Sequence, residues 1–336
     1  MTASRIPGLD ALRGLAAVLV LVFHLRGLGL PMAVLDHGYL AVDLFFVISG
    51  FVLARAYDAE LTVGYGAGFM IKRLKRLYPM ILLGLLLGAV VWAARGRDPS
   101  VLPMLLALGL LFVPMTGTPD AFPLNGPQWS LLWELLANLV YAGVAPWLTT
   151  RRLGLLVLAG GIGHAILAAK AGTGSLGPSG HDGWSAAPRV IYGFFAGVLL
   201  ARQEARWRVP AAPITVLLAA VVLTLCAPIP EAGRAAFDLA ATLVVFPLLV
   251  ASAARAPVTG PLRPVLDGLA GLSYALYALH IPIVLGLAHW KLGLLALPLA
   301  LTVAWVVHLW FEPWAAQLLR KRPQGVSTRA PSSSTR

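Results

Sequence analysis

Long apolar blocks constrain the fold of this chain more than any other feature of its sequence. They run for roughly 16–25 residues and are separated by short stretches rich in Gly, Pro and Arg. A helix of about 20 residues crosses a bilayer core about 30 Å thick. The blocks are continuous rather than alternating, and lipid requires backbone hydrogen bonds within each segment, which favours helices over a β-barrel. We therefore predict an all-α polytopic transmembrane helical bundle.

Composition agrees with a membrane protein, because 59% of the 336 residues are hydrophobic and only 12% are charged. Soluble domains carry about 25% charged residues. We predict one membrane domain over residues 1–320 and a disordered cytoplasmic tail over 321–336. The first segment reads as a retained span, not a cleaved signal. The predicted membrane segments are 9–28, 39–57, 74–94, 101–115, 130–148, 153–169, 187–202, 211–227, 235–254, 268–288 and 293–315.

Lys and Arg positions suggest how the segments are oriented. The basic group at 320–323 predicts a cytoplasmic C-terminus, which places the loops 116–128 and 171–186 outside. If every predicted segment crosses, counting back from a cytoplasmic C-terminus places the basic cluster at 72–76 outside. It lies on the cytoplasmic side only if one early segment does not cross. The short run at 101–115 is the natural re-entrant segment. We expect 10–11 membrane segments in a bacterial inner membrane.

The formal net charge of +12 does not indicate a nucleic-acid-binding protein, because the cations lie in the connections between apolar blocks. A single cysteine, Cys226, excludes an internal disulfide. No His, Cys, Asp and Glu group has zinc-site spacing, and we see no Gly-rich phosphate loop. We expect neither a metal nor a resident cofactor.

The first segment retains Arg13 and His24 inside its apolar run. Eleven residues of helix put them on one face, about 16 Å apart. Ionisable groups kept within a span usually face a cavity or a partner. Each alone could be explained as a snorkelling arginine or a packed histidine, but their shared face favours function.

Four further charged residues lie at or inside apolar segments. Asp43 stands at the start of the second segment and could orient an imidazole, bind a hydroxyl or face headgroups. Arg73 and Arg76 share a helix face, as phosphate recognition requires, although a basic cluster also sets topology. Glu134 lies one turn into the fifth segment and requires a partner or a wet cavity.

Other features of the sequence are weaker indications. Tyr277 and His280 lie on neighbouring helical turns. Glu312 directly precedes Pro313, and we predict a structural role for it. The spacings Gly84-x3-Gly88 and Gly193-x3-Gly197 would permit close helix contacts. Five other histidines lie in loops or lack acidic neighbours and receive no role: His37, His164, His181, His289 and His308.

Six stretches together resemble the acyltransferase 3 family, the integral membrane acyltransferases of bacterial surface sugars and some secondary metabolites. They are LDALRGLAAVLVLVFH with its Arg-x10-His, VDLFFVISGF, KRLKRLYP with its Arg-x2-Arg, WSLLWE, SYALYALHIP and the terminal FEP. They occur in the family's order between residues 8 and 314. Residues 150–265 carry no matching motif, and acceptor specificity could reside there.

This resemblance implies acyl transfer, most simply of acetyl, from cytoplasmic acyl-CoA as co-substrate to a hydroxyl of a glycan, glycolipid or small metabolite. It implies that Arg13 and His24 are essential and that Arg73 and Arg76 assist donor binding. We predict His24 as general base, or as a transient acyl carrier. Glu134 or Asp43 would orient His24 or contact the acceptor. The predicted substrate-binding set is completed by Trp129, Ser130, Tyr277 and His280.

Two other classes of protein are compatible with intramembrane ionisable groups. A secondary transporter or lipid-linked-sugar exporter could use His24, Asp43 and Glu134 as a proton relay. Such proteins often show internal repeats, and we find none. A sensor or scaffold would leave the shared Arg13 and His24 face unexplained.

Overall fold

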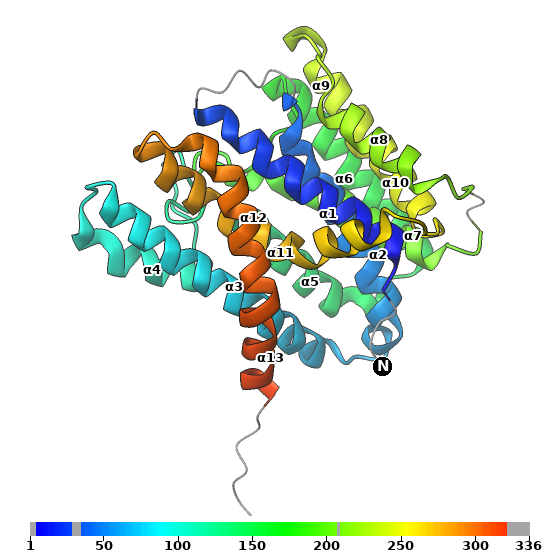
Figure 1. Ribbon diagram of the computed structural model, residues 1–336. Helices are drawn as coiled ribbons and strands as arrows, with labels where there is room; N and C mark the ends of the chain where they lie inside the picture. Colours follow the sequence, from blue (N-terminus) through cyan, green and yellow to red (C-terminus); the bar gives the residue numbers. More distant parts are fainter. Residues whose placement is uncertain (1–4, 29–34, 207–208, 321–336) are drawn as a thin grey trace, which may run out of the picture.

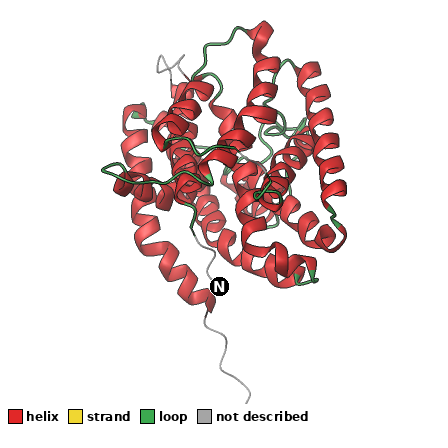
Figure 2. Cartoon of the chain, turned by 90° about the vertical axis from the view of Figure 1, so that its right-hand side faces the viewer, coloured by secondary structure: helices red, strands yellow, loops and turns green. Residues whose placement is uncertain are grey.

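The computed structural model describes residues 5–28, 35–206 and 209–320. All regular secondary structure in these residues is helical, as Figures 1 and 2 show. The predicted all-α bundle is therefore confirmed. The predicted tail at 321–336 lies outside the described residues.

The helices follow the predicted segments in order. Short 3-10 or π turns extend several of them, including π turns at Ala241–Val245 and Val307–Phe311. The α-helices are α1 Pro7–His24, α2 Ala41–Thr62, α3 Gly66–Ala94, α4 Leu102–Leu110, α5 Gln128–Val144, α6 Thr150–Ala171, α7 Ala186–Arg202, α8 Ile214–Leu225, α9 Glu231–Ala240, α10 Phe246–Ala253, α11 Arg263–His289, α12 Ala296–Val306 and α13 Glu312–Arg320.

Eight helical stretches among the described residues are long and apolar enough to cross a membrane. The chain is therefore a multi-pass membrane protein. The predicted segment at 101–115 contains the nine-residue helix α4, which is too short to cross alone at about 1.5 Å per residue. Helix α8 has 12 residues and is shorter than the predicted 211–227 segment, because Pro213 precedes it and Pro228 soon follows it.

The most buried helices lie at the centre of the bundle. Helix α1 packs along α11, and α2 packs along α7, as Figure 1 shows. The predicted glycine contacts are confirmed at both sites. A Cβ atom on Gly197 would lie 2.1 Å from the carbonyl oxygen of Val47 in α2, and one on Gly84 would lie 2.9 Å from that of Ala278 in α11. Only glycine allows the backbones this close approach.

Two prolines within helical stretches free carbonyls that other side chains then use. Pro282 in α11 has no N–H, so the carbonyl four residues earlier loses its helical donor. That carbonyl, of Ala278, accepts a hydrogen bond from Asn125 Nδ2 at 2.9 Å. In the same way the Leu243 carbonyl, four residues before Pro247, accepts one from the Tyr192 hydroxyl. The first bond holds the loop before α5 against α11, and the second holds α7 against the π turn at Ala241–Val245.

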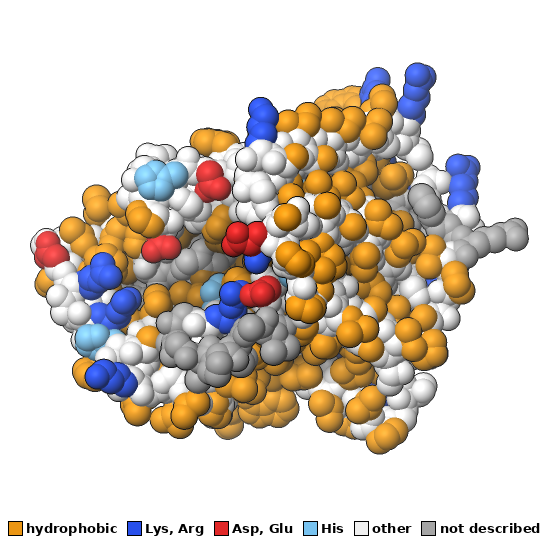
Figure 3. Space-filling view, turned by 90° about the horizontal axis from the view of Figure 1, so that it is seen from above, with side chains coloured by type: hydrophobic (Ala, Val, Ile, Leu, Met, Phe, Trp, Pro, Cys, Tyr) orange, Lys and Arg blue, Asp and Glu red, His pale blue; other side chains and the backbone are white. Residues whose placement is uncertain are grey.

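The outside of the bundle is largely apolar. Figure 3 shows hydrophobic side chains over the right-hand part of one face, with the visible acidic side chains on the left and centre and a few Lys or Arg side chains at the far edge. Large apolar residues such as Leu223, Val244 and Trp310 are well exposed. A continuous apolar exterior marks a surface made for lipid or a partner rather than water.

Candidate active site

One cavity of about 1000 Å³ lies between the helices. It is bounded by α1, α2, α3, α5, α11 and the region from the last π turn through α13. Its polar lining consists of Arg13, Ser49, Lys72, Arg73, Lys75, Arg76, Ser130, Glu134, Ser273, Tyr274, Tyr277, His308 and Glu312. Five of these side chains are cationic, so the lining carries more positive than negative charge. Predicted site residues from four helices therefore meet in one space.

Arg13 lies on the cavity wall and is held by both its own helix and α11. Its Nη2 pairs with Asp10 Oδ1 at 2.7 Å, and its Nε donates to Ser273 Oγ at 3.2 Å. Asp10 also pairs with exposed Arg5. These contacts leave the guanidinium half-buried and oriented toward the cavity.

Arg73 and Glu134 form an ion pair within the cavity wall. Arg73 Nη2 lies 2.5 Å from Glu134 Oε1, and the same oxygen accepts from Ser49 Oγ at 2.9 Å. The Arg73 side chain is 8% exposed. Burial of either charge alone would be costly, so this pair meets the partner requirement expected of Glu134.

Arg76 differs from Arg73 although the two were predicted as one donor-binding pair. It lines the cavity and is exposed, and no described residue forms an ion pair with it. Lys72 and Lys75 are also exposed on the same wall. Lys72 pairs with Glu60 at 3.2 Å, and Lys75 donates to the Leu319 carbonyl oxygen. Arg76 is therefore the exposed cation of this wall that is best able to bind an anion.

The deep end of the cavity is formed by aromatic and hydroxyl groups. Tyr277 is 8% exposed, and its hydroxyl lies 2.5 Å from Ser130 Oγ. Phe45 packs edge-on against it, with ring centroids 5.4 Å apart. Behind Tyr277 lies His280, with ring centroids 5.8 Å apart. Two predicted substrate-binding residues, Ser130 and Tyr277, therefore line the cavity, whereas His280 does not.

His24 is the next side chain beyond His280. Its ring centroid lies 4.9 Å from that of His280, and its Nδ1 lies 2.8 Å from the Val20 carbonyl oxygen. Arg13 and His24 thus contact two residues of one helix, Ser273 and His280. Their predicted shared face is confirmed as the face that α1 presents to α11.

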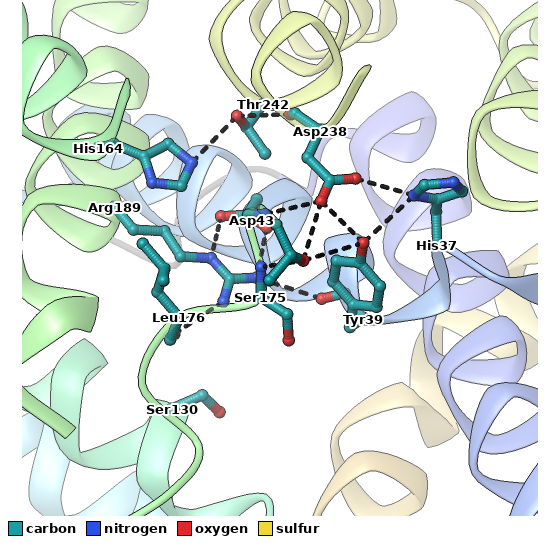
Figure 4. Close-up of polar contacts among 12 residues, drawn as sticks. His37, Tyr39, Asp43, Ser130, His164, Ser175, Leu176, Arg189, Asp238 and Thr242 are labelled. Atoms are coloured by element: carbon teal, nitrogen blue, oxygen red, sulfur yellow. Dashed lines mark hydrogen bonds and ion pairs between the residues drawn. The ribbon is translucent and has the colours of Figure 1, made fainter. Parts of the chain in front are cut away.

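Asp43 does not orient His24. Both its oxygens pair with Arg189 of α7, at 2.6 Å from Nε and 2.6 Å from Nη2 (Figure 4). Arg189 also donates to the carbonyls of Leu176 and Tyr39, and its guanidinium lies 5.7 Å from the centroid of the Trp129 ring. Asp43 and Trp129 therefore belong to a buried cluster outside the cavity.

The same cluster contains His37, a predicted loop histidine that received no role from the sequence. His37 Nδ1 lies 2.8 Å from Asp238 Oδ1, and both side chains are fully buried. Tyr39 and the Gly174 backbone N–H donate to the other oxygen of Asp238. His37 and Tyr39 come from the short turn before α2, and Asp238 comes from α9. Figure 4 shows them converging with Ser175 and Leu176 of the loop after α6. The cluster ties this loop to the transmembrane helices.

His308 was wrongly judged to lack an acidic neighbour. Its Nδ1 lies 2.9 Å from Glu312 Oε2, and both side chains line the cavity at the last π turn. Their spacing of four residues places them on one helix face, so the sequence contained this signal. Arg189 and Asp238 could likewise have been flagged as charges within apolar segments. Ser49 carried no such signal.

Among the residues that the structure describes, no three His, Cys, Asp or Glu side chains are grouped to hold a metal ion.

Comparison with known proteins decides the family. A family model described as an acyltransferase domain, that of the acyltransferase 3 family, matches residues 6–311. The chain belongs to the acyltransferase 3 family. Its motifs therefore lie in a membrane acyltransferase, and the cavity unites most of them.

Curated relatives share parts of the chain. Protein 2 in the picA locus of Rhizobium radiobacter is 40% identical over 157 residues, covering 40% of this chain and 79% of the relative. A Staphylococcus aureus protein named as an O-acetyltransferase is 39% identical over 82 residues. A Bacillus subtilis protein named as a peptidoglycan O-acetyltransferase is 34% identical over 91 residues. These two alignments cover 23% and 26% of this chain and only 13% of each relative. No solved structure gives a significant match.

The Asp43–Arg189 pair yields the first testable prediction. Asp43→Asn leaves the Arg189 charge buried without its partner, which costs about 3–5 kcal/mol. We expect a large fall in the unfolding temperature of the detergent-purified protein. Asp267→Asn, which removes an exposed pair with Arg263, should cost at most about 1 kcal/mol.

The double variant Asp43→Asn/Arg189→Gln should recover part of the lost stability, because no buried charge then remains. A stable but inactive Asp43→Asn variant would contradict this account and would indicate a catalytic role for Asp43.

Proposed function

We propose that this protein is a membrane O-acyltransferase that moves an acetyl group from acyl-CoA to a hydroxyl, with His24 as the general base. The observation that carries the proposal is the cavity itself. Its open wall carries exposed cations, and Tyr277 at its deep end packs against His280, which in turn packs against His24. His24 itself does not line the cavity.

The cation-rich wall suits the donor. Coenzyme A is polyanionic, and guanidinium groups bind phosphates through paired N–H donors. Arg76 and Lys75 are exposed to it without an ion-pair partner among the described residues. Lys72 is exposed but paired with Glu60, and Arg73 is paired with Glu134. The apolar lining beyond, with Val42, Phe45 and Met80, suits the pantetheine arm and a short acyl group. Acyl-CoA is the co-substrate in this scheme, with no resident cofactor.

His24 is suited to deprotonate the acceptor. Its Nδ1 is bonded to a backbone carbonyl, so in the neutral ring Nε2 carries the lone pair. The acceptor hydroxyl gives its proton to Nε2 as its oxygen attacks the thioester carbon. The C–S bond then breaks, and the thiolate takes the proton. General-base catalysis of this kind contributes about 10²–10⁴-fold.

The family and the relatives' names support the choice of acetyl and of a glycan hydroxyl. We place the chain in a bacterial cytoplasmic membrane with its C-terminus and its cationic cavity wall on the cytoplasmic side, where acyl-CoA is made. The acceptor would approach His24 from the opposite side. Glycolipids and small metabolites remain alternative acceptors of the same chemistry.

Loss of His24 is the direct test of this function. Purified protein in detergent is given labelled acetyl-CoA and cell-surface glycan whose esters have been removed by mild alkali. We expect His24→Ala to lose at least about 100-fold in transfer, whereas His289→Ala, which changes an exposed histidine, should match wild type.

Near-wild-type transfer by His24→Ala would refute the base assignment. Label retained covalently on the wild-type protein but not on His24→Ala would show instead that His24 carries the acyl group. Because detergent provides no sealed compartment, absence of CoA release from the wild-type protein would favour the transporter.

Arg76 should affect donor binding rather than chemistry. Arg76→Ala removes an exposed cation that the donor phosphates would contact, so KM for acetyl-CoA should rise about 3- to 10-fold with little change in kcat. The rise should shrink at high salt. Steady-state kinetics at two ionic strengths measure both effects.

Arg151→Ala is the matched control, because Arg151 is exposed and does not line the cavity. An unchanged KM in Arg76→Ala, or an equal rise in Arg151→Ala, would place the donor phosphates elsewhere.

A further inference from the structure

His280 is positioned to act on His24 rather than on the substrate. It does not line the cavity and is 1% exposed. Its Nε2 lies 3.3 Å from His24 Nδ1. The two rings therefore meet through defined nitrogen atoms, and the chemistry of each nitrogen follows from its other contacts.

Backbone carbonyls assign the proton on His280. Its Nδ1 lies 2.8 Å from the Tyr277 carbonyl oxygen and 3.2 Å from that of Leu276. Carbonyl oxygens only accept, so Nδ1 must carry the hydrogen. A neutral imidazole has one N–H, which leaves a lone pair on Nε2 directed at His24.

The same reasoning assigns the proton on His24. Its Nδ1 donates to the Val20 carbonyl oxygen at 2.8 Å and faces the lone pair of His280 Nε2. Two acceptors thus share one N–H group. This arrangement fixes the ring and its tautomer, and it leaves Nε2 of His24 as the basic nitrogen.

We propose that His280 is a positioning residue that holds His24 in its basic tautomer and stabilises the imidazolium formed during transfer. This inference rests on the proposed function and replaces the predicted substrate contact of His280. When Nε2 of His24 takes the acceptor proton, positive charge spreads to Nδ1–H. The hydrogen bond to His280 then becomes charge-assisted and stronger.

The surroundings of His280 keep its lone pair in place. Asn125 holds the Ala278 carbonyl that Pro282 leaves without a helical donor. Ser130 holds the hydroxyl of Tyr277, whose ring lies beside His280. Both bonds come from outside α11 and anchor the helix two and three residues before His280.

Two substitutions distinguish the roles of the two ring nitrogen atoms of His280. His280→Gln can place an amide oxygen near the position of Nε2 and so keep an acceptor for His24. His280→Asn can keep a donor for the Tyr277 carbonyl but is too short to reach His24. We expect His280→Asn to lower kcat about 10- to 150-fold, the range for losing a hydrogen bond to a charged group. KM for acetyl-CoA and for the glycan should stay within about twofold, and His280→Gln should regain most of kcat.

Wild-type kcat in His280→Asn, a raised KM for the glycan without loss of kcat, or equal losses in both variants would overturn the inference. Full transfer by His24→Ala is a different result and counts against the proposed function. The unfolding temperature of both His280 variants serves as a control, since a merely structural role would lower kcat only in step with stability.

Nitrogen NMR provides a readout that does not depend on activity. In ¹⁵N-histidine-labelled protein in nanodiscs, the His24 signals are identified by their loss in His24→Ala. We expect wild-type His24 to be protonated at Nδ1 and not at Nε2, and to become a mixture of tautomers in His280→Asn. Protonation of wild-type His24 at Nε2 would also overturn the inference.

Discussion

A charge buried in an apolar bundle must be paired, and this requirement determines where the helices of this protein can lie. Arg73 of α3 is bound by Glu134 of α5, and Asp43 of α2 is bound by Arg189 of α7. Removing one partner from such a pair is strongly destabilising. Each pair therefore fixes the relative position of two helices, and between them they connect the cavity wall to the buried cluster behind it.

Close backbone contact between α1 and α11 fixes the positions of Arg13 and His24. Gly14 of α1 lies against the backbone of Leu269 and Ala270, so α1 and α11 can run side by side. Their contact brings Arg13 to Ser273 and His24 to His280. In the proposed function, the cationic wall that binds the donor and the base His24 lie apart along α1, with about 16 Å between Arg13 and His24.

The sequence was sufficient to predict the fold class, the order of the helices and the shared face of Arg13 and His24. Apolar blocks and helical periodicity are local properties, and both survive in the structure. Partners far apart in sequence were not predictable in the same way. Nothing local links Asp43 to Arg189, which lies 146 residues away, so Asp43 was assigned to His24 because both stood near one end of their segments.

The sequence also could not show which of two neighbouring arginines is paired and which is exposed. Arg73 and Arg76 share a motif, but only the bundle shows that one is paired and the other is exposed to the cavity. The pairing of His308 with Glu312 was predictable from their spacing and was overlooked. His37 and Asp238 meet only because three separate elements converge on them.

The central claim is that one cavity holds the donor with its thioester directed toward His24. A cryo-EM structure with a non-hydrolysable acetyl-CoA analogue measures this most directly. The account predicts phosphates beside Arg76 and the exposed lysines of α3, with the acetyl group at Tyr277 on the side of His24. Phosphates bound elsewhere, or an acetyl group directed away from Tyr277, would contradict it.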